Sequence, residues 1–317
     1  MTAEKNTLLI KAEALRLGFT GCGIAKAEEL TEDARRLEAW LNQGHQAGMS
    51  YMERNFDLRT DPRKLVPGAK SVITMLLNYY PEEVQNADAP RIAKYAWGTD
   101  YHYVIRDKLN QLISFVNDNI GAVSGRGFVD SAPVLERSWA VRSGLGWIGK
   151  NGNLLNRQSG SFFFIATLVS DLDLVFDAPF ATGHCGTCTR CIVACPTEAI
   201  VSPAVIDAGK CISYLTIELK DALIPNEFHD KMEGWMFGCD ICQDVCPWNR
   251  FSHPHHEPAF TPIQEILNFS LAEWAGISEE HFNKVFKNSP LKRSKWKGVL
   301  RNVGVINTTN RNSNGST

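Results

Sequence analysis

Apolar residues follow two different spacings in the first 180 positions, and their alternation predicts a layered arrangement of helices and strands. Leu8, Leu9, Ala12 and Leu15 recur at helical spacing, whereas the run Ser71–Leu77 is almost continuously apolar and predicts a buried strand. The expected helices cover about residues 8–15, 31–41, 100–120 and 133–143, and the further strands 127–130 and 161–169. Thr31 would cap the second helix with its hydroxyl. The mixture is typical of a layered α/β or α+β domain, and we expect the α+β class.

The pattern changes near Pro179. Residues 181–250 are dense in Cys, Gly and Pro with little apolar periodicity, so this segment needs something other than hydrophobic burial to hold it together. Helical patterning returns over 260–306, and the last eleven residues are polar and of low complexity. We therefore expect a first domain over 1–178, a cysteine-rich module over 179–250, a short basic helical segment over 251–306 and a disordered tail over 307–317.

Charge and hydropathy exclude several classes of protein. The 317 residues carry 33 basic and 35 acidic side chains, a net charge of −2, so a polyanion would have to bind at a local patch. No apolar run approaches the roughly 18 residues of a membrane span, and the first residues lack the compact apolar region of a signal peptide. We expect a soluble, cytoplasmic protein.

The number and clustering of the cysteines are the most informative features of the composition. Eight of the nine cysteines lie between positions 185 and 246. Residues 185–196 read CGTCTRCIVACP, the spacing of a bacterial ferredoxin run, and residues 239–247 read CDICQDVCP, a partner run with one ligand missing. Cys211, between the two runs, completes the count. In a reducing compartment such crowding indicates metal or redox chemistry rather than disulfides.

Crosswise pairing of the two runs divides the eight thiols into two groups of four, because the fourth cysteine of each run points toward the other cluster. One [4Fe–4S] cluster would take Cys185, Cys188, Cys191 and Cys246, and the other Cys195, Cys211, Cys239 and Cys242. Structural zinc is the competing interpretation, but zinc sites do not use three cysteines at successive x2 spacing followed by Cys-Pro. Cys22, between two glycines, fits a buried free thiol.

Two clusters move single electrons and do no organic chemistry by themselves. The rest of the chain must hold a second cofactor or dock a partner. Neither G-x-G-x-x-G after a strand nor a P-loop is present, which removes the simple nicotinamide and nucleotide interpretations.

The chain resembles the epoxyqueuosine reductases, a cobalamin-dependent family related to reductive dehalogenases. The resemblance extends from about residue 10 to about residue 304. It rests on the cysteine runs and on the segments GFVDSAPVLERSWAVRSGLGWIGKNGNLL (127–155), RIAKYAWGTDYH (91–102) and CISYLTIELK (211–220). It implies a cobalamin-binding first domain and reduction of the epoxide of epoxyqueuosine, at the wobble position of tRNA anticodons, to queuosine. Longer members continue into HEAT-like repeats, of which the helical segment over 251–306 would be a truncated form.

The resemblance also implies a proton donor. Asp130 matches the aspartate of the family's D-x-x-P-x-x-E-R motif, and burial near an apolar ring would raise its pKa. The alternative is that Asp130 or Ser131 caps the helix that starts near Pro133. We expect Glu136 and Arg137 to form an ion pair that orients this helix.

By similarity, base-off cobalamin would contact residues of the first domain and of the cysteine-rich module. They are Arg54, Asp130, Asn151, Asn153, Ser213, Thr216, Asp240 and Ile241. The pair Asp240–Ile241 would set the ring against the second cluster. Asp100-x-His102 resembles the start of a motif that supplies a cobalt ligand, but Ile105 stands where that motif has Gly, so we interpret His102 as an ordinary residue.

A tRNA partner requires a local positive surface. Between Lys284 and Arg301 there are seven basic residues and no acidic one. The expected tRNA contacts are Lys220, Lys292, Arg293, Lys295, Lys297 and Arg301. Without the resemblance, the same run would be interpreted as a solvated helix face.

Two other functions remain open at this stage. One is a reductive dehalogenase-like enzyme for a small organic substrate, and the other is a cobalamin-free electron-transfer module, which would leave Asp130 without a role. We further expect a low-potential electron donor of the ferredoxin or flavodoxin type, and a monomer.

Overall fold

The structure is a computed structural model that describes residues 2–220 and 223–314, with residues 308–314 described by their backbone alone. A four-stranded antiparallel sheet forms the centre of its N-terminal half. The strand order is β1 (Gly21–Lys26), β2 (Ser71–Asn78), β7 (Phe163–Ser170) and β4 (Gly125–Phe128). This sheet, with helices packed on it, confirms the α+β class.

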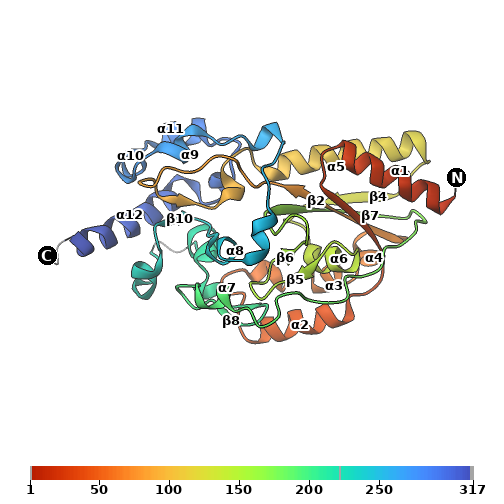
Figure 1. The fold of residues 1–317 in the computed structure, drawn as a ribbon, viewed down its shortest axis with the longest axis horizontal. Helices are drawn as coiled ribbons and strands as arrows, with labels where there is room; N and C mark the ends of the chain where they lie inside the picture. The colour runs from red at the N-terminus through yellow and green to blue at the C-terminus, as the bar shows by residue number, and fades with distance from the viewer. Residues whose placement is uncertain (1, 221–222, 315–317) are drawn as a thin grey trace.

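Helices cover both faces of the sheet (Figure 1). On one face, α1 (Ala3–Arg16) and α5 (Tyr101–Asn119) pack on inward side chains such as Ile73 and Met75. On the other, α6 (Glu136–Arg142) buries Trp139 and Ala140. Because both faces are covered, every residue of β2 is buried, which explains the continuous apolar run there. The remaining elements of this half are α2 (Thr31–Asn42), α3 (Phe56–Thr60), α4 (Pro62–Leu65), β5 (Trp147–Ile148) and β6 (Leu154–Leu155).

The predicted helices and strands of this half are present, with two local differences. Thr31 does not cap α2 but is its first residue, and the N-cap is Leu30, which makes no side-chain cap. The helix α6 begins at Glu136 rather than near Pro133, because residues 130–135 form an irregular connection after β4.

The cysteine-rich region is built from very short elements. They are α7 (Arg190–Val193), β8 (Ile200–Ser202), β9 (Val205–Ile206), the π-helix Tyr214–Glu218, β10 (Trp235–Phe237) and α8 (Ile241–Asp244). The strand β10 pairs in parallel with β3 (Arg91–Ile92), a segment from the first 178 residues. The core of the C-terminal region therefore includes Ile92 and Trp97 from that earlier segment.

Helices α9 (Gln264–Asn268), α10 (Leu271–Gly276), α11 (Glu279–Val285) and α12 (Lys295–Asn314) complete the fold. They pack around Trp274, Phe282 and Val299 at the end of the molecule opposite α1 (Figure 1). The prediction of a disordered tail is wrong for residues 307–314, because α12 continues to Asn314. Extending a helix that has already formed is favourable, since each added residue gains a backbone hydrogen bond. Residues 315–317 lie outside the described residues. No described helix is both long and apolar enough to cross a membrane.

Candidate active site

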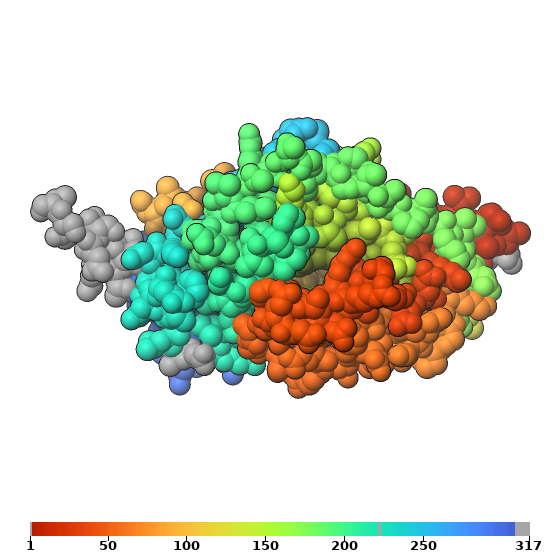
Figure 2. Space-filling view, turned by 90° about the horizontal axis from the view of Figure 1, so that it is seen from below, coloured from red at the N-terminus to blue at the C-terminus, as the bar shows by residue number. Residues whose placement is uncertain are grey.

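A cavity of about 830 Å³ lies between the sheet domain and the cysteine-rich region. Its lining combines Asp130 and His102 from the first half with Cys195, Cys211, Cys239 and Cys242 from the second. Figure 2 looks toward the hollow between the orange N-terminal segment and the green segments of the cysteine-rich region. The volume is near the upper end of the roughly 300–1,000 Å³ range of small-molecule sites.

Asp130 stands on one wall of this cavity and is held there by hydrogen bonds. The Tyr101 hydroxyl donates to Asp130 Oδ2 over 2.7 Å, and His102 Nε2 lies 3.5 Å from the same oxygen. On the other side of the ring, His102 Nδ1 lies 2.8 Å from Asp100 Oδ1. The backbone of Asp130 is left-handed, with φ of 53°, a conformation that costs a non-glycine residue energy and is common at functional sites. More than half of its side-chain surface, 58%, remains exposed.

The titration of this group differs from the sequence-based expectation. Although the Asp130 side chain is accessible from the cavity, the surrounding protein displaces part of its water, which by itself would raise the pKa. Hydrogen bonds from His102 and Tyr101 outweigh this effect, so the pKa lies below its usual value. Burial would lower the His102 pKa, but Asp100 and Asp130 together raise it to about 9. The residues around Asp130 therefore shift its pKa in the opposite direction from the one expected beside an apolar ring, and the group that holds a proton at neutral pH is His102.

The capping interpretation of Asp130 does not hold in the structure. The N-cap of α6 is Leu135 and makes no side-chain cap. Glu136 and Arg137 also take separate partners instead of the expected ion pair: Glu136 Oε1 accepts the Asp130 amide at 2.8 Å, and Arg137 donates to the Gly152 carbonyl at 2.8 Å. Burial, and next the charge of Asp130, raise the Glu136 pKa to about 8.

The thiols that influence one another electrostatically are ones that the expected crosswise pairing assigns to the same cluster. The pKa of the Cys246 thiol is raised by burial and further by the charges of Cys185 and Cys188, and that of Cys191 by burial, Cys246 and Cys185. In the second group, burial raises the pKa of Cys242, as do Cys239, Cys211 and Cys195. All nine cysteines are free thiols. Among the described residues, no three or more His, Cys, Asp and Glu side chains converge on a single-ion site.

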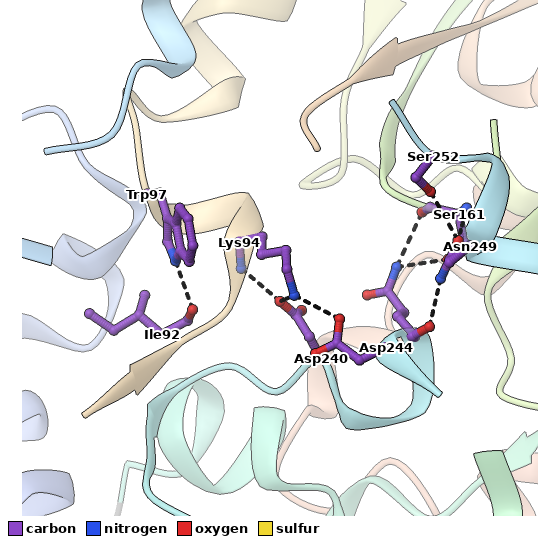
Figure 3. Close-up of polar contacts among 9 residues, drawn as sticks. Ile92, Lys94, Trp97, Ser161, Asp240, Asp244, Asn249 and Ser252 are labelled. Atoms are coloured by element: carbon purple, nitrogen blue, oxygen red, sulfur yellow. Dashed lines mark hydrogen bonds and ion pairs between the residues drawn. The ribbon is translucent and has the colours of Figure 1, made fainter. Parts of the chain in front are cut away.

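The second cysteine run is anchored to the sheet domain by buried polar contacts (Figure 3). Asp240 Oδ2 accepts the Lys94 amide at 2.8 Å, and Lys94 Nζ lies 2.7 Å from Asp244 Oδ1. On the other side of α8, Asn249 Oδ1 accepts the Ser161 amide at 2.7 Å, while Asn249 Nδ2 donates to the Gln243 carbonyl over the same distance. These contacts fix the run although α8 is only four residues long.

The structure brings most, but not all, of the expected cobalamin contacts to the cavity. Asn151, Asn153, Ser213, Asp240 and Ile241 line it together with Asp130. Arg54 is exposed and is not part of the lining. Thr216 is fully buried behind the wall, where its hydroxyl donates to the Ile212 carbonyl at 2.7 Å and accepts the Gly238 amide at 3.0 Å.

The expected tRNA contacts also divide. Lys292 and Arg293 line the cavity, whereas Lys220, Lys295 and Lys297 are exposed on the surface. The Arg301 guanidinium instead donates to the carbonyls of Leu215 and Leu219, both at 2.8 Å, so it ties α12 to the π-helix. The wall of the cavity is thus supported by the C-terminal helix.

Comparison with known proteins agrees with this geometry. Residues 184–249 match the family model of the 4Fe-4S double cluster binding domain, and residues 59–131 match that of epoxyqueuosine reductase QueG, DUF1730. An epoxyqueuosine reductase of Cellulophaga algicola is 58% identical over 305 residues, covering 96% of this chain and 99% of the relative. This chain belongs to the epoxyqueuosine reductase family.

Solved structures of the family have the same fold. A selenomethionine-labelled epoxyqueuosine reductase superposes with a TM-score of 0.88 at 30% identity, covering 96% of this chain and 82% of that one. Another, described as bound to an epoxyqueuosine-modified tRNA-Tyr stem loop, gives 0.86 at 30% identity, with 95% and 80% covered. A reductive dehalogenase described as B12-dependent, with a TM-score of 0.50 at 17% identity over 99% of this chain and 37% of that one, shares the fold alone.

Two residues of the epoxyqueuosine reductase cavity were missed by the sequence analysis. His102 was interpreted as ordinary and Tyr101 was not considered, yet both contact Asp130. The sequence did contain a signal for the start of this helix, since Asp100 caps α5 by accepting the His102 amide at 3.0 Å. In the structure, the first turn of α5 lies next to the segment after β4. Only the tertiary fold shows that these two segments meet.

Proposed function

We propose that this chain reduces epoxyqueuosine in tRNA to queuosine, and that its cavity is where the epoxide reacts. Deoxygenation of an epoxide to an alkene consumes two electrons and two protons and releases water. The observation that carries the proposal is that one cavity has an aspartate with two hydrogen-bonding partners on one wall and four cysteine thiols on the other. Family membership supports the same substrate.

The thiols fit two [4Fe–4S] clusters. Each group contains four cysteines and no other ligand type, which suits iron–sulfur chemistry. Cys185, Cys188, Cys191 and Cys246 would hold the first, and Cys195, Cys211, Cys239 and Cys242 the second. The clusters would supply electrons one at a time, and the second group is the one that lines the cavity.

The cavity also fits base-off cobalamin, which when bound supplies a strongly reducing cobalt centre. Its volume suits a large ring, and Asn153, Ser213 and Ile241 are placed to hold one. The side chain of Asn151 is already engaged, since it donates to the Cys242 carbonyl and accepts the Asn153 amide, so its role is to shape the loop. The Asp240 carboxylate is engaged in the same way, since it accepts the Lys94 amide. Both His102 ring nitrogens face carboxylates, so His102 is not proposed as a cobalt ligand.

Asp130 and His102 act together as the proton source. At neutral pH the pair holds one proton, because the His102 pKa is about 9 while that of Asp130 is low. As the epoxide oxygen gains negative charge, the proton held by His102 passes to it through the Asp130 carboxylate, which contacts His102 and lines the cavity. The second proton that the reaction consumes comes from water, to which the Asp130 side chain is accessible. Tyr101, whose pKa is raised by burial, stays protonated and fixes the direction of the carboxylate.

Positive charge at the cavity would receive the anticodon backbone. Lys287, Lys292 and Arg293 line it, and Arg293 is held by Glu218 through a 2.6 Å ion pair. Lys220, Lys295 and Lys297 extend this charge over the neighbouring surface. The domain limits at residues 178 and 250, the cytoplasmic location and the monomeric state stay predictions.

The experiment is a turnover assay under anaerobic conditions. Protein reconstituted with iron, sulfide and cobalamin is given titanium(III) citrate and an epoxyqueuosine-containing tRNA stem loop, and the nucleosides are analysed by mass spectrometry. We expect queuosine in the complete mixture and none without cobalamin. Absence of queuosine, together with dehalogenation of a bromophenol by the same preparation, would favour the reductive dehalogenase alternative instead.

A further inference from the structure

A second hollow lies beside the helix pair α7 and α8, and the residues that line it are different from those of the cavity. Its volume is about 780 Å³. It is lined by Tyr80, Phe162, Thr189, Arg190, Val193, Ala194, Asp244, Val245, Cys246, Pro247, Asn249 and Arg250. Cys246 belongs to the first cysteine group, so this hollow adjoins the first cluster site as the cavity adjoins the second.

The two cysteine groups adjoin different hollows. All of their cysteines are partly buried, but those of the second group, among them Cys239 and Cys242, line the cavity, whereas Cys246 of the first group lines the second hollow. Electrons that reach the cavity pass the second group last, because its cysteines form the cavity wall. The first group, which lies away from the cavity, is therefore where electrons enter, and the second hollow is the surface beside it.

The charge of this surface is mainly positive. Residues 181–197 and 245–256 contain no Asp or Glu, and their only Lys or Arg residues are Arg190 and Arg250, both exposed. The one acidic residue that lines the hollow, Asp244, forms an ion pair with Lys94. Neither Arg190 nor Arg250 forms an ion pair with a described residue, so an approaching molecule meets their positive charge.

Exposed apolar side chains lie within the same surface. Val193, on α7, is 80% exposed. Phe251 is 39% exposed and lies under the Arg250 guanidinium, 4.3 Å from its ring centroid. Apolar groups surrounded by charges of one sign are typical of transient protein interfaces, in which charge steers the encounter and a small apolar area completes it.

We propose that an acidic one-electron carrier protein docks on this surface, which we call the entry face: Arg190, Val193, Arg250 and Phe251. The inference rests on the proposed function, since it supplies that reaction with electrons. Each docked carrier in its reduced form loses one electron to the first cluster and leaves oxidised, so two docking events provide the two electrons that one epoxide consumes.

A nucleic acid is the other partner that positive charge could attract, and the geometry favours the protein. The tRNA has to reach Asp130, and basic residues at that cavity include Lys287, Lys292 and Arg293. Among the residues that the structure describes, none lines both hollows. The carrier can thus dock while the tRNA is bound, which two successive electron deliveries require.

The test measures cluster reduction directly, without tRNA. Flavodoxin hydroquinone, an acidic carrier, is mixed anaerobically with the reconstituted protein in a stopped-flow instrument, and bleaching of the cluster absorbance gives a second-order rate constant. We expect Arg190→Glu and Val193→Asp each to lower this constant about tenfold at low ionic strength, and added salt to lower the wild-type constant. Val193→Thr, which preserves shape without charge, is the matched control and should stay near the wild-type rate.

A slower rate could come from weaker docking or from damaged clusters, and a small reductant that needs no docking surface distinguishes the two causes. Reduction by titanium(III) citrate should proceed equally in all these variants and in Lys5→Glu, a charge reversal on the distant helix α1. Unchanged rates with flavodoxin in both Arg190→Glu and Val193→Asp would overturn the proposal. So would equal losses with both reductants, or weakened binding of the tRNA stem loop with normal flavodoxin rates. Because queuosine formation is not measured here, failure of the proposed function shows separately in the turnover assay.

Discussion

The two walls of the cavity are built in different ways. The wall with Asp130 is backed by the sheet and by α5, a helix of 19 residues whose apolar side packs into the main core. The wall with the second cysteine group consists of a four-residue helix, a π-helix and loops. Packing and hydrogen bonds within the chain can hold the first wall in place. The second wall has few such contacts and would depend on the iron–sulfur cluster that we propose its thiols bind.

Helix energetics explain why. Four-residue helices are too short to be stable alone, since nucleation costs more than a few hydrogen bonds return. The cysteine wall instead relies on anchors at its edges: Lys94 on Asp240 and Asp244, Ser161 on Asn249, and Arg301 on the π-helix. The proton-supplying wall is thus preorganised, and the electron-supplying wall is completed by its ligands.

The largest effect is expected at the cysteine wall. Cys242→Ser should remove the second cluster, lower the iron content by about half and abolish queuosine formation, because the cavity loses its neighbouring electron source. The matched control is Cys22→Ser, in strand β1 and outside both groups, which should keep iron content and turnover. Iron analysis and the turnover assay check both. Full activity in Cys242→Ser would show that the second wall needs no cluster.

A smaller effect is expected at the proton wall. His102→Gln keeps a hydrogen-bonding group but cannot carry the proton, so turnover should fall about 10²-fold while cluster and cobalamin content are retained. Because the His102 pKa of about 9 lies above its unperturbed value, the wild-type rate should hold at neutral pH and fall as pH rises through about 9. A pH–rate profile of both proteins checks this. An alkaline limb preserved in the variant would assign it to another group.

The anchors between the walls can be tested by stability. Lys94→Met removes the only cation that the ion pairs give to Asp240, a residue 2% exposed, in the part of the chain that the structure describes. Loss of one partner of a buried pair typically costs about 3 kcal/mol. Chemical unfolding of the reconstituted variant should show a loss of this size, and a change below about 0.5 kcal/mol would mean that the backbone amide alone satisfies the carboxylate.

The smallest effect is expected outside both walls. Lys297 is exposed on the first turns of α12, so Lys297→Glu should weaken binding of the tRNA stem loop several-fold and lower the salt-dependence slope of binding by about 1. Turnover at saturating tRNA should not change. Binding isotherms at several salt concentrations, beside Lys5→Glu, check this, and an identical slope in Lys297→Glu and wild type would remove Lys297 from the interface.

The same contrast explains what could be predicted from the sequence. Elements with apolar periodicity, such as α5 and β2, were predicted close to their observed limits. The cysteine spacing, also a local pattern, indicated the double-cluster domain that the family model matches over residues 184–249. The pairing of β3 with β10, and the burial of Thr216 behind the cavity wall, depend on contacts between residues far apart in sequence, which no local pattern shows.

The pKa values of the site depend on such contacts as well. Asp130 was expected to be protonated because a buried carboxyl normally is, but that rule omits donors from another element. Tyr101 and His102 come from α5, and their hydrogen bonds reverse the direction of the shift. The aspartate could be identified from a motif, whereas its protonation required the folded structure.

The most direct test of the account is a single turnover by Asp130→Asn protein. The variant, reconstituted and fully reduced before mixing with the epoxyqueuosine stem loop, is analysed for iron, cobalt and queuosine. The account predicts the iron and cobalt content of the wild type and no queuosine above the uncatalysed background, because electrons are available and the proton is not. Queuosine formed at the wild-type rate would contradict it.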